Sequence, residues 1–404
     1  MVKDFEQLLS ESSRRMKKSA IRELLKLTSK PGLISFAGGL PSPLTFPTEQ
    51  LKEISCEVLE NDGPAALQYS TTEGDTNLRK ILAERYAAQG LKITQDNLII
   101  VTSSQQALDL IPKVFINPGD KIIVGLPSYL GGIQSFHNYG AKMIGVKHDK
   151  YGMSSEKLEE ELKLLHDIGE KPKFVYIIPD FQNPAGVTMP EWRRLEIIEI
   201  CKKYDVLIIE DSPYRELRFE GEPQKTIYQL ADEGRVLLLG TFSKIFVPGF
   251  RIGWIIGNEK ILDKIVMSKQ SVDLCTSSFV QKIAARYIEK GYFDKNLQNI
   301  ISLYKEKKDV MMKAFEDYLP EGVTWTNPEG GLFLFVTLPE RMDAEELFMT
   351  AVENNVAFVI GKVFHCNESG KNTMRINFSY ASKEEIVEGV KRLGKAIKDM
   401  MDKK

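Results

Sequence analysis

Five short apolar runs, each ending in a polar or glycine-containing turn, most constrain how this 404-residue chain can fold. Their continuous Val, Ile and Leu residues indicate strands that are buried on both faces, and therefore a mostly parallel sheet. Parallel strands bind ligands at their carboxyl ends, so we expect the five turns to meet in one site. The runs are NLIIVTSSQ (97–105), KIIVGLPSY (121–129), FVYIIPDFQNP (174–184), VLIIEDSPY (206–214) and RVLLLGTFSK (235–244).

The segments between these runs carry helical periodicity. In PEWRRLEIIEICKKY (190–204), for example, apolar residues recur at helical spacing at Trp192, Leu195, Ile198 and Ile200. Alternating strands and helices predict the α/β fold class, with a mostly parallel central sheet flanked by helices.

After about residue 290 the character of the sequence changes. Apolar runs such as LFLFVTL and TMRINFSY are separated by charged helical segments, which is typical of a smaller α+β domain. Near the start, SAIRELLKLTSKPG predicts a short helix that stops at its Pro-Gly pair. We predict three parts: an N-terminal helix and arm (1–50) that packs with the small domain and the active site, a large domain (51–290) and a small C-terminal domain (291–404).

Composition argues against several classes of function. The formal net charge of −2 offers no electrostatic attraction for nucleic acid or an anionic membrane. No run approaches the roughly 20 apolar residues that span a bilayer, and the charged N-terminus lacks the apolar core of a secretion signal. The four cysteines are far apart and form no C-x-x-C pair, which indicates reduced thiols. We therefore expect a cytoplasmic protein with neither a nucleic-acid partner nor a membrane.

Two of the five turns carry residues whose chemistry suggests a ligand. Ser103, Ser104 and Gln105 open a helix, whose free N–H groups and positive dipole suit a phosphate, although Ser and Thr also cap helices that bind nothing. Asp211 ends the fourth run, where a buried carboxylate needs a cation. An internal salt bridge, a metal ion or a ligand could supply that cation. The four histidines show no ligand spacing, so we predict no metal site.

Lys244 follows the fifth run, within GTFSKIFVPGFRIGW (240–254). A lysine near the interior tends to lose its proton and becomes a nucleophile suited to Schiff-base chemistry. Thr241, Ser243 and Arg251 offer hydroxyls and a cation to a phosphate. Pyridoxal 5′-phosphate (PLP) has an aldehyde for Lys244, a ring nitrogen for Asp211 and a phosphate for the remaining groups. We therefore predict PLP as the cofactor.

A late strand supplies a second arginine. In TMRINFSY (373–380), Met374, Ile376 and Phe378 alternate with Arg375 and its polar neighbours. Strand alternation turns Arg375 away from the apolar face, toward whatever lies opposite. The alternative is a solvated arginine at a sheet edge.

The order of these motifs resembles that of the class I aminotransferases of PLP fold type I over nearly the whole chain. The shared features are S-K with an arginine seven residues on, N-P-x-G, a strand ending in Asp211 with Tyr214 three residues later, and a late M-R-I strand. Other segments resemble the 2-aminoadipate and kynurenine aminotransferases, a subgroup also related to the aminotransferase-like half of certain transcription regulators. These segments are SAIRELLKL, ISFAGGLP, LQYSTTEG, SSQQALDL, PSYLGG, FQNPAG and FSYAS.

The resemblance implies a role for each residue around the cofactor. Lys244 would bond the aldehyde and, once released by substrate, carry a proton between the substrate Cα and the cofactor C4′. Asp211 would pair with the ring nitrogen, Asn183 and Tyr214 would hydrogen-bond the 3′-oxygen, and Tyr129 would stack on the ring. The phosphate would be held by Ser104, Gln105, Thr241, Ser243 and Arg251, and by Tyr69 of the neighbouring subunit in a homodimer with shared active sites.

The resemblance also implies substrate contacts. Arg375 would bind the substrate α-carboxylate as a bidentate fork, with Gly39 and Asn183 nearby. In aminoadipate-type relatives an arginine on the N-terminal helix folds over the substrate and meets a distal carboxylate. Arg22 matches that position, and the alternative is a solvent-facing arginine beside Glu23.

The implied function is transamination in amino-acid metabolism, by a ping-pong mechanism. One substrate pair would be glutamate and 2-oxoglutarate, and the other would be 2-aminoadipate, an aromatic or a branched-chain amino acid with its 2-oxo acid. Another PLP reaction on this fold, such as that of a β-lyase or a decarboxylase, stays open, as does a non-catalytic PLP-binding regulator. A DNA-binding regulator would need a helix-turn-helix domain, which we do not expect in the few tens of residues before FAGGLP. The chain also lacks the G-x-G-x-x-G and G-x-x-x-x-G-K-[ST] patterns of nicotinamide and nucleotide enzymes.

Overall fold

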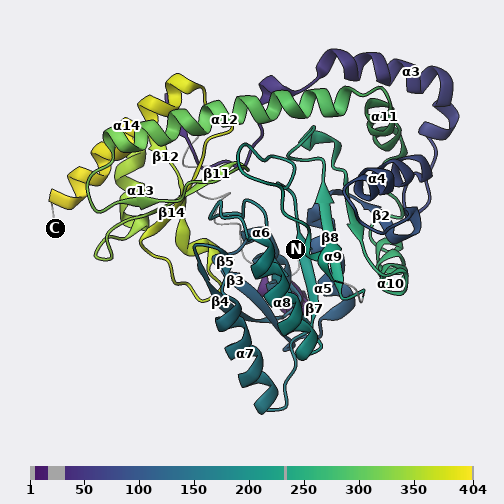
Figure 1. The fold of residues 1–404 in the computed structure, drawn as a ribbon, viewed down its shortest axis with the longest axis horizontal. Helices are drawn as coiled ribbons and strands as arrows, with labels where there is room; N and C mark the ends of the chain where they lie inside the picture. The colour runs from purple at the N-terminus through teal and green to yellow at the C-terminus, as the bar shows by residue number, and fades with distance from the viewer. Residues whose placement is uncertain (1–4, 17–31, 232–233, 403–404) are drawn as a thin grey trace.

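An eight-stranded sheet forms the centre of the protein (Figure 1). The structure is a computed structural model in which residues 5–16, 32–231 and 234–402 are described. The five apolar runs supply β2, β3, β6, β7 and β8, which run parallel to one another, so the expected mostly parallel sheet is confirmed. In spatial order the strands are β2 (Leu98–Val101), β9 (Gly253–Ile256), β8 (Val236–Thr241), β7 (Leu207–Asp211), β6 (Phe174–Ile177), β3 (Lys121–Leu126), β4 (Lys142–Asp149) and β5 (Gly152–Met153).

The strand β9 is an element that sequence reasoning missed. It lies antiparallel between β2 and β8, with Gly253 opposite both Val101 and Thr241. Because β9 starts where its neighbours end, the residues that precede it lie at the carboxyl edge of the parallel strands. Arg251 is thereby brought to the edge where β8 ends.

Helices cover both faces of this sheet, which explains why the five runs in it are continuously apolar. One face packs against α5 (Ser103–Phe115), α6 (Leu130–Asn138) and α10 (Glu259–Gln270). The other face packs against α7 (Ser155–Asp167), α8 (Glu191–Lys203) and α9 (Ile227–Leu230). Near β2 and β9 that second face is covered by α4 (Thr76–Ala88) and α11 (Ser278–Glu289).

The predicted helix α8 is present, with Ile198 buried as expected, but two of the other apolar residues of the pattern face outward. Trp192 and Leu195 are 45% and 43% exposed, whereas Arg194 is fully buried. The Arg194 guanidinium donates to both carboxylate oxygens of the buried Asp180, at 2.6 and 3.3 Å, and to the carbonyl oxygen of Met189 at 2.8 Å. A paired and fully hydrogen-bonded arginine can be buried, so Arg194 occupies an inward position that the hydrophobic pattern did not predict.

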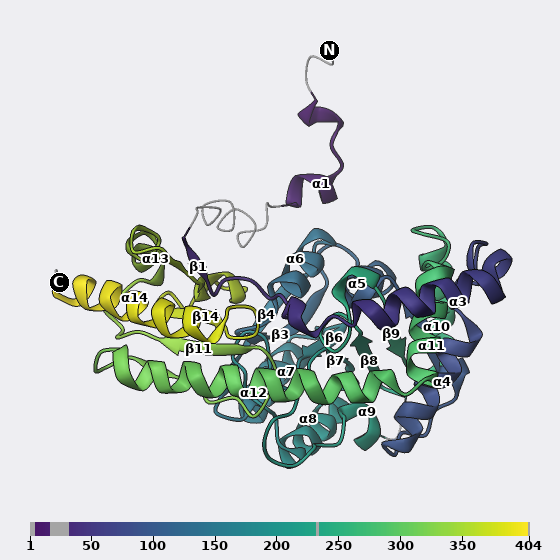
Figure 2. The ribbon, with the colours of Figure 1, turned by 90° about the horizontal axis from the view of Figure 1, so that it is seen from above.

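A smaller antiparallel sheet lies beside the first, in the order β10 (Thr324–Trp325), β11 (Phe333–Thr337), β14 (Thr373–Asn377) and β13 (Val359–Ile360). The long helix α12 (Tyr292–Tyr318) runs along both sheets (Figure 2). This part also contains α13 (Ala344–Glu353) and α14 (Lys383–Asp402). The predicted α/β class with a smaller α+β part is therefore confirmed, while the boundaries at residues 50 and 290 stay predictions.

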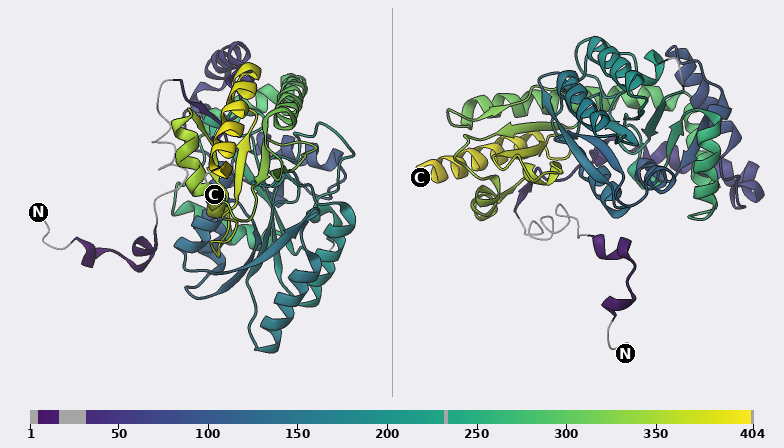
Figure 3. Two further views of the ribbon diagram at one scale, coloured as in Figure 1. Left: turned by 90° about the vertical axis from the view of Figure 1, so that its left-hand side faces the viewer. Right: turned by 90° about the horizontal axis from the view of Figure 1, so that it is seen from below.

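Segments of the N-terminal region contact the rest of the protein at several separate places. α1 (Glu11–Arg15) lies against α6, where Ser12 Oγ donates to the carbonyl oxygen of Asn138 at 3.1 Å. Figure 3 shows η1 (Glu6–Leu8) and α1 extending away from the two sheets. Further on, β1 (Ile34–Ser35) pairs with β12 (Val356–Ala357), and α3 (Thr48–Ala66) packs on α11. The helix predicted around Arg22 lies outside the described residues.

Across the described ranges, we find no helix with the length and apolar character needed to cross a membrane.

Replacing Arg194 by leucine tests the buried ion pair. We expect Arg194→Leu to lower the free energy of unfolding by about 3–5 kcal/mol, because the Asp180 carboxylate stays buried without its cation. Urea denaturation at a fixed protein concentration measures the change. The control Lys313→Ala breaks an exposed pair with Asp317 and should cost no more than about 0.5 kcal/mol. Equal losses in the two variants would contradict the stabilising role of the buried pair.

Candidate active site

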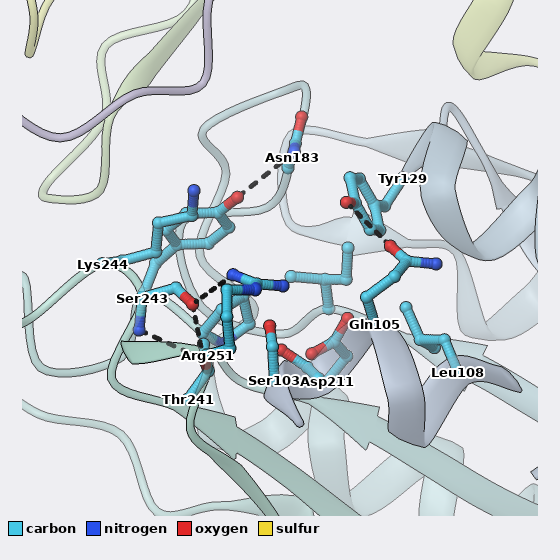
Figure 4. Close-up of a pocket in the computed structure, with 14 residues that line it drawn as sticks. Ser103, Gln105, Leu108, Tyr129, Asn183, Asp211, Thr241, Ser243, Lys244 and Arg251 are labelled. Atoms are coloured by element: carbon cyan, nitrogen blue, oxygen red, sulfur yellow. Dashed lines mark hydrogen bonds between the residues drawn. The ribbon is translucent and has the colours of Figure 1, made fainter. Parts of the chain in front are cut away.

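The turns that follow the five parallel strands line one pocket at the carboxyl edge of the central sheet (Figure 4). The turn before β9 completes its wall. Eleven residues that the sequence singled out lie around it: Ser103, Ser104, Gln105, Tyr129, Asn183, Asp211, Tyr214, Thr241, Ser243, Lys244 and Arg251. Their roles remain predictions, but the structure brings their side chains together.

One end of the pocket can receive an anion. The start of α5 presents Ser103 and Ser104 there, and the first N–H groups of a helix have no partner within it. Thr241 Oγ1 lies 3.0 Å from Ser243 Oγ, which accepts a long hydrogen bond of 3.4 Å from Arg251 Nη1. Figure 4 shows Arg251 beside Ser243. Two hydroxyls, a guanidinium and a helix start suit a phosphate.

Gly253 allows the backbones at this end to approach closely. A Cβ atom on Gly253 would lie 2.7 Å from both Ser103 C and Ser104 N. Any side chain at this position would therefore have to displace the start of α5. Gly249, by contrast, has open space around its missing Cβ. Of the two glycines that flank Arg251, only Gly253 is required by this packing.

Asp211 is a buried carboxylate with an unmet hydrogen-bonding oxygen. Its Oδ2 accepts from the Tyr176 hydroxyl at 2.6 Å, whereas Oδ1 has no partner. Burial raises the pKa of Asp211 to about 6, and the Tyr176 hydrogen bond opposes that rise. Among the described residues Asp211 has no ion-pair partner and belongs to no group of three or more metal-ligating side chains. The oxygen Oδ1 is therefore available to a ligand.

Tyr176 is a residue that sequence reasoning missed. It lies within the apolar run of β6, on the strand next to Asp211, and is 1% exposed. Its hydroxyl orients the Asp211 carboxylate. A tyrosine inside an otherwise aliphatic strand was the available signal, since a buried Tyr hydroxyl usually needs a partner.

Lys244 lies in the pocket and its Nζ donates to the carbonyl oxygen of Gly39 at 2.8 Å. Burial lowers the pKa of Lys244 to about 8, with further lowering from the charges of Arg375 and Arg251. A substantial fraction of the amine is therefore neutral, and nucleophilic, near neutral pH. The same hydrogen bond places Gly39 beside the pocket.

Arg375 is 3% exposed, so the alternative of a solvated edge arginine is wrong. It lies on β14, an inner strand of the small sheet. Nη1 donates to Asn183 Oδ1 at 3.0 Å and Nη2 to the carbonyl oxygen of Ala37 at 2.8 Å, while Nε has no partner. Asn183 Nδ2 in turn donates to the Tyr214 hydroxyl at 3.2 Å. This chain of hydrogen bonds joins Arg375 to the polar groups of the pocket.

The rings of two phenylalanines lie close to the Arg375 guanidinium. Its Cζ lies 4.3 Å from the ring centroid of Phe333 and 5.1 Å from that of Phe364. Burial lowers the pKa of Arg375 to about 10, and the nearby tyrosines Tyr214 and Tyr129 oppose this. Among the described residues no carboxylate pairs with this guanidinium, so the two rings add to its hydrogen bonds with Asn183 and Ala37. Neither phenylalanine carried a sequence signal, because each lies in an apolar segment.

Tyr129 belongs to the pocket, whereas the structure does not place Tyr69 or Arg22 there. Tyr129 lies across the pocket from Lys244 in Figure 4, and its hydroxyl donates to Gln105 Oε1 at 3.3 Å. Tyr69 does not line this pocket; it is 77% exposed on the segment between α3 and α4. Arg22 lies outside the described residues.

The pocket fits PLP on three observations. Asp211 Oδ1 is a buried acceptor without a partner, as a protonated ring nitrogen requires. Lys244 supplies an amine with a lowered pKa for an aldehyde. The start of α5, which the backbone approaches closely at Gly253, lines the pocket and suits a phosphate.

Comparison with known proteins agrees with a PLP-binding pocket. Residues 35–393 match the family model described as aminotransferase class I and II. The chain is 50% identical to aromatic-amino-acid aminotransferase 1 of Thermococcus litoralis, over 99% of this chain and 96% of that protein. It is 39% identical to 2-aminoadipate transaminase of Thermus thermophilus, over 96% of each.

A solved structure supports the cofactor as well. Kynurenine aminotransferase of Pyrococcus horikoshii, solved in complex with PMP and with kynurenine as substrate, aligns with a TM-score of 0.95 and 47% identity over 99% of each chain. PMP, pyridoxamine phosphate, is the amine form of PLP. The family match spans far more than half of the chain, and it agrees with the chemistry of the pocket. The chain therefore belongs to the class I and II aminotransferases, and its cofactor is pyridoxal 5′-phosphate.

Proposed function

We propose that the enzyme transfers an amino group between L-amino acids and 2-oxo acids by a ping-pong mechanism, with glutamate and 2-oxoglutarate as one pair. The observation that carries this proposal is a nucleophilic amine, Lys244, in a pocket to which Asn183 joins the buried guanidinium of Arg375. An amine for the cofactor and a fork for a carboxylate are what an amino-acid substrate needs. We further propose a cytoplasmic homodimer.

Each side chain has a task in this proposal. When bound, PLP supplies an aldehyde and a ring that accepts electrons. Asp211 Oδ1 would accept a hydrogen bond from the protonated ring nitrogen, and Asn183 and Tyr214 would hydrogen-bond the 3′-oxygen. Lys244 Nζ carries the proton to and from the substrate Cα. Ser104, Gln105, Thr241, Ser243 and Arg251 bind the phosphate, and Tyr129 stacks on the ring.

The partner substrate is an aromatic amino acid, 2-aminoadipate or a branched-chain amino acid. The names of the relatives from Thermococcus, Thermus and Pyrococcus support the first two classes. Arg375 binds the α-carboxylate, beside Gly39 and Asn183, and Arg22 contacts a distal carboxylate when the substrate has one. The exposed Tyr69 of one subunit contacts the cofactor phosphate in the other subunit, so that each active site of the dimer contains residues of both subunits.

Absorbance titration of the holoenzyme tests the reaction. We expect glutamate, 2-aminoadipate, phenylalanine and leucine each to convert the band of the lysine-linked cofactor into that of pyridoxamine phosphate, and their midpoints rank the donors. Lys244→Ala should abolish catalytic turnover. Ammonia with pyruvate as products would indicate a β-lyase instead, and a band that no amino acid converts would contradict transamination.

The same titration with Arg22→Ala tests the distal contact. We expect weaker response to glutamate and 2-aminoadipate, and little change for leucine, because only the first two have a second carboxylate. Equal changes for all donors would contradict this role.

Arg375→Lys tests the α-carboxylate site. Lysine keeps the charge but loses the two-pronged geometry, and a hydrogen bond to a charged group contributes about 1.5–3 kcal/mol. We therefore expect kcat/KM to fall by about one to two orders of magnitude for every amino donor. The control Arg218→Lys changes another arginine over a phenylalanine ring, Phe181, outside the pocket, and should keep kcat/KM. Unequal losses across donors would argue against an α-carboxylate contact.

The pKa of Lys244 predicts how cofactor capture depends on pH. As the pH rises toward about 8, the neutral form of Lys244 becomes more abundant, so the rate at which the cofactor-free chain reacts with PLP should rise about tenfold per pH unit. Above about pH 8 this rate should level off. Removing a nearby positive charge raises this pKa, so Arg375→Gln should move the midpoint to higher pH. Stopped-flow absorbance measures both, with n-propylamine and PLP as the free-amine control. A midpoint near that of an ordinary lysine would contradict the burial of Lys244.

A further inference from the structure

The loop between α10 and α11 brings a carboxylate, Asp273, to the start of α5. Asp273 Oδ2 accepts from Thr102 Oγ1 at 2.9 Å and from Gln106 Nε2 at 2.7 Å. Gln106 Oε1 accepts from the backbone N–H of Thr102 at 2.7 Å. Thr102 is the N-cap residue of α5, so these bonds converge where the helix begins. None of the three residues lines the pocket.

Thr102 directly precedes a strained residue of the anion-binding end. Ser103 has a φ of +68°, in the left-handed region that a residue with a Cβ rarely adopts. Such a conformation persists only where its surroundings hold it. The bonds on the Thr102 hydroxyl and N–H hold the chain that leads into this turn, and the turn keeps Ser103 and Ser104 in the pocket wall.

A buried lysine compensates the charge of Asp273. Lys269, in the last turn of α10, is fully buried, and its Nζ donates to Asp273 Oδ1 at 2.7 Å. Burial opposes ionisation of Asp273, but the hydrogen bonds from Lys269, Gln106 and Thr102 outweigh it and lower the pKa of the carboxyl. A bare carboxylate next to this helix start would repel an anion. With Lys269 beside it, Asp273 gives Thr102 an acceptor without adding a net charge.

We propose that Asp273 is a positioning residue for the cofactor phosphate, acting through the Thr102–Ser103 turn, and that Lys269 removes its repulsion of that phosphate. This inference rests on the proposed role of the α5 start and Arg251 as the phosphate site. Asp273 and Lys269 contact neither substrate nor reacting atoms. Their effect is therefore on cofactor affinity rather than on the chemical step.

Two cofactor probes separate this role from a general structural one. Equilibrium binding of PLP and of pyridoxal, which lacks the phosphate, is measured by absorbance with the full chain after removal of its cofactor. We expect Asp273→Ala to weaken PLP binding about tenfold, as loss of an N-cap contact does, and to change pyridoxal binding less than about twofold. The control Ser271→Ala lies in the same loop but contacts Lys113 and Ser268, away from the turn, and should change neither.

Kinetics at saturating PLP give a second readout. There, kcat and KM of Asp273→Ala should stay close to those of the parent chain. Equal weakening of both probes, or no weakening of either, would overturn the inference. A parent chain that binds PLP no tighter than pyridoxal would overturn the phosphate site itself, and this inference with it.

The charge compensation has its own test. Lys269→Met leaves the Asp273 carboxylate without its cation and should weaken PLP binding more than pyridoxal binding. Adding Asp273→Asn to Lys269→Met removes that charge and should restore part of the lost PLP affinity. Losses that simply add in the double variant would overturn the compensating role of Lys269.

Discussion

The common direction of five strands is the constraint on which the pocket depends. Because β2, β3, β6, β7 and β8 end at the same edge, residues more than 100 positions apart line one cavity. Helices on both faces bury the strands and hold the edge in place. The reversed strand β9 then adds Arg251 at that edge, and its Gly253 lets the backbone lie against the start of α5.

Polar groups without partners give this rigid edge its chemistry. Asp211 Oδ1 and Arg375 Nε are buried and unpaired, and Lys244 is held beside two positive charges. Leaving a buried donor or acceptor unmet costs about 1–3 kcal/mol, so the protein alone keeps these groups at a cost that a ligand offsets. In the function that we propose, a ring nitrogen, an aldehyde and a carboxylate would match them one by one.

Residues at strand ends could be predicted from the sequence, whereas those that support them could not. Asp211 and Lys244 stand out because each follows a continuous apolar run. Tyr176 on β6 contacts Asp211, and Phe333 on β11 and Phe364 in a short 3-10 helix (Gly361–Phe364) contact Arg375, but their own segments look like ordinary core. Hydrophobic periodicity was also wrong for Trp192 and Leu195 on α8, because an arginine that is paired and hydrogen-bonded can replace an apolar residue in the interior.

The sequence by itself determined the parallel sheet, the edge where ligands bind and the residue types that meet there, because apolar runs and the turns after them are local patterns. The tertiary structure alone decided which groups stay unpaired, how far each pKa moves and what holds the strained Ser103 turn. Those properties arise from contacts such as Thr102 with Asp273 and Arg375 with Asn183. Such contacts join segments far apart in the chain, and burial and distance exist only once the chain has folded.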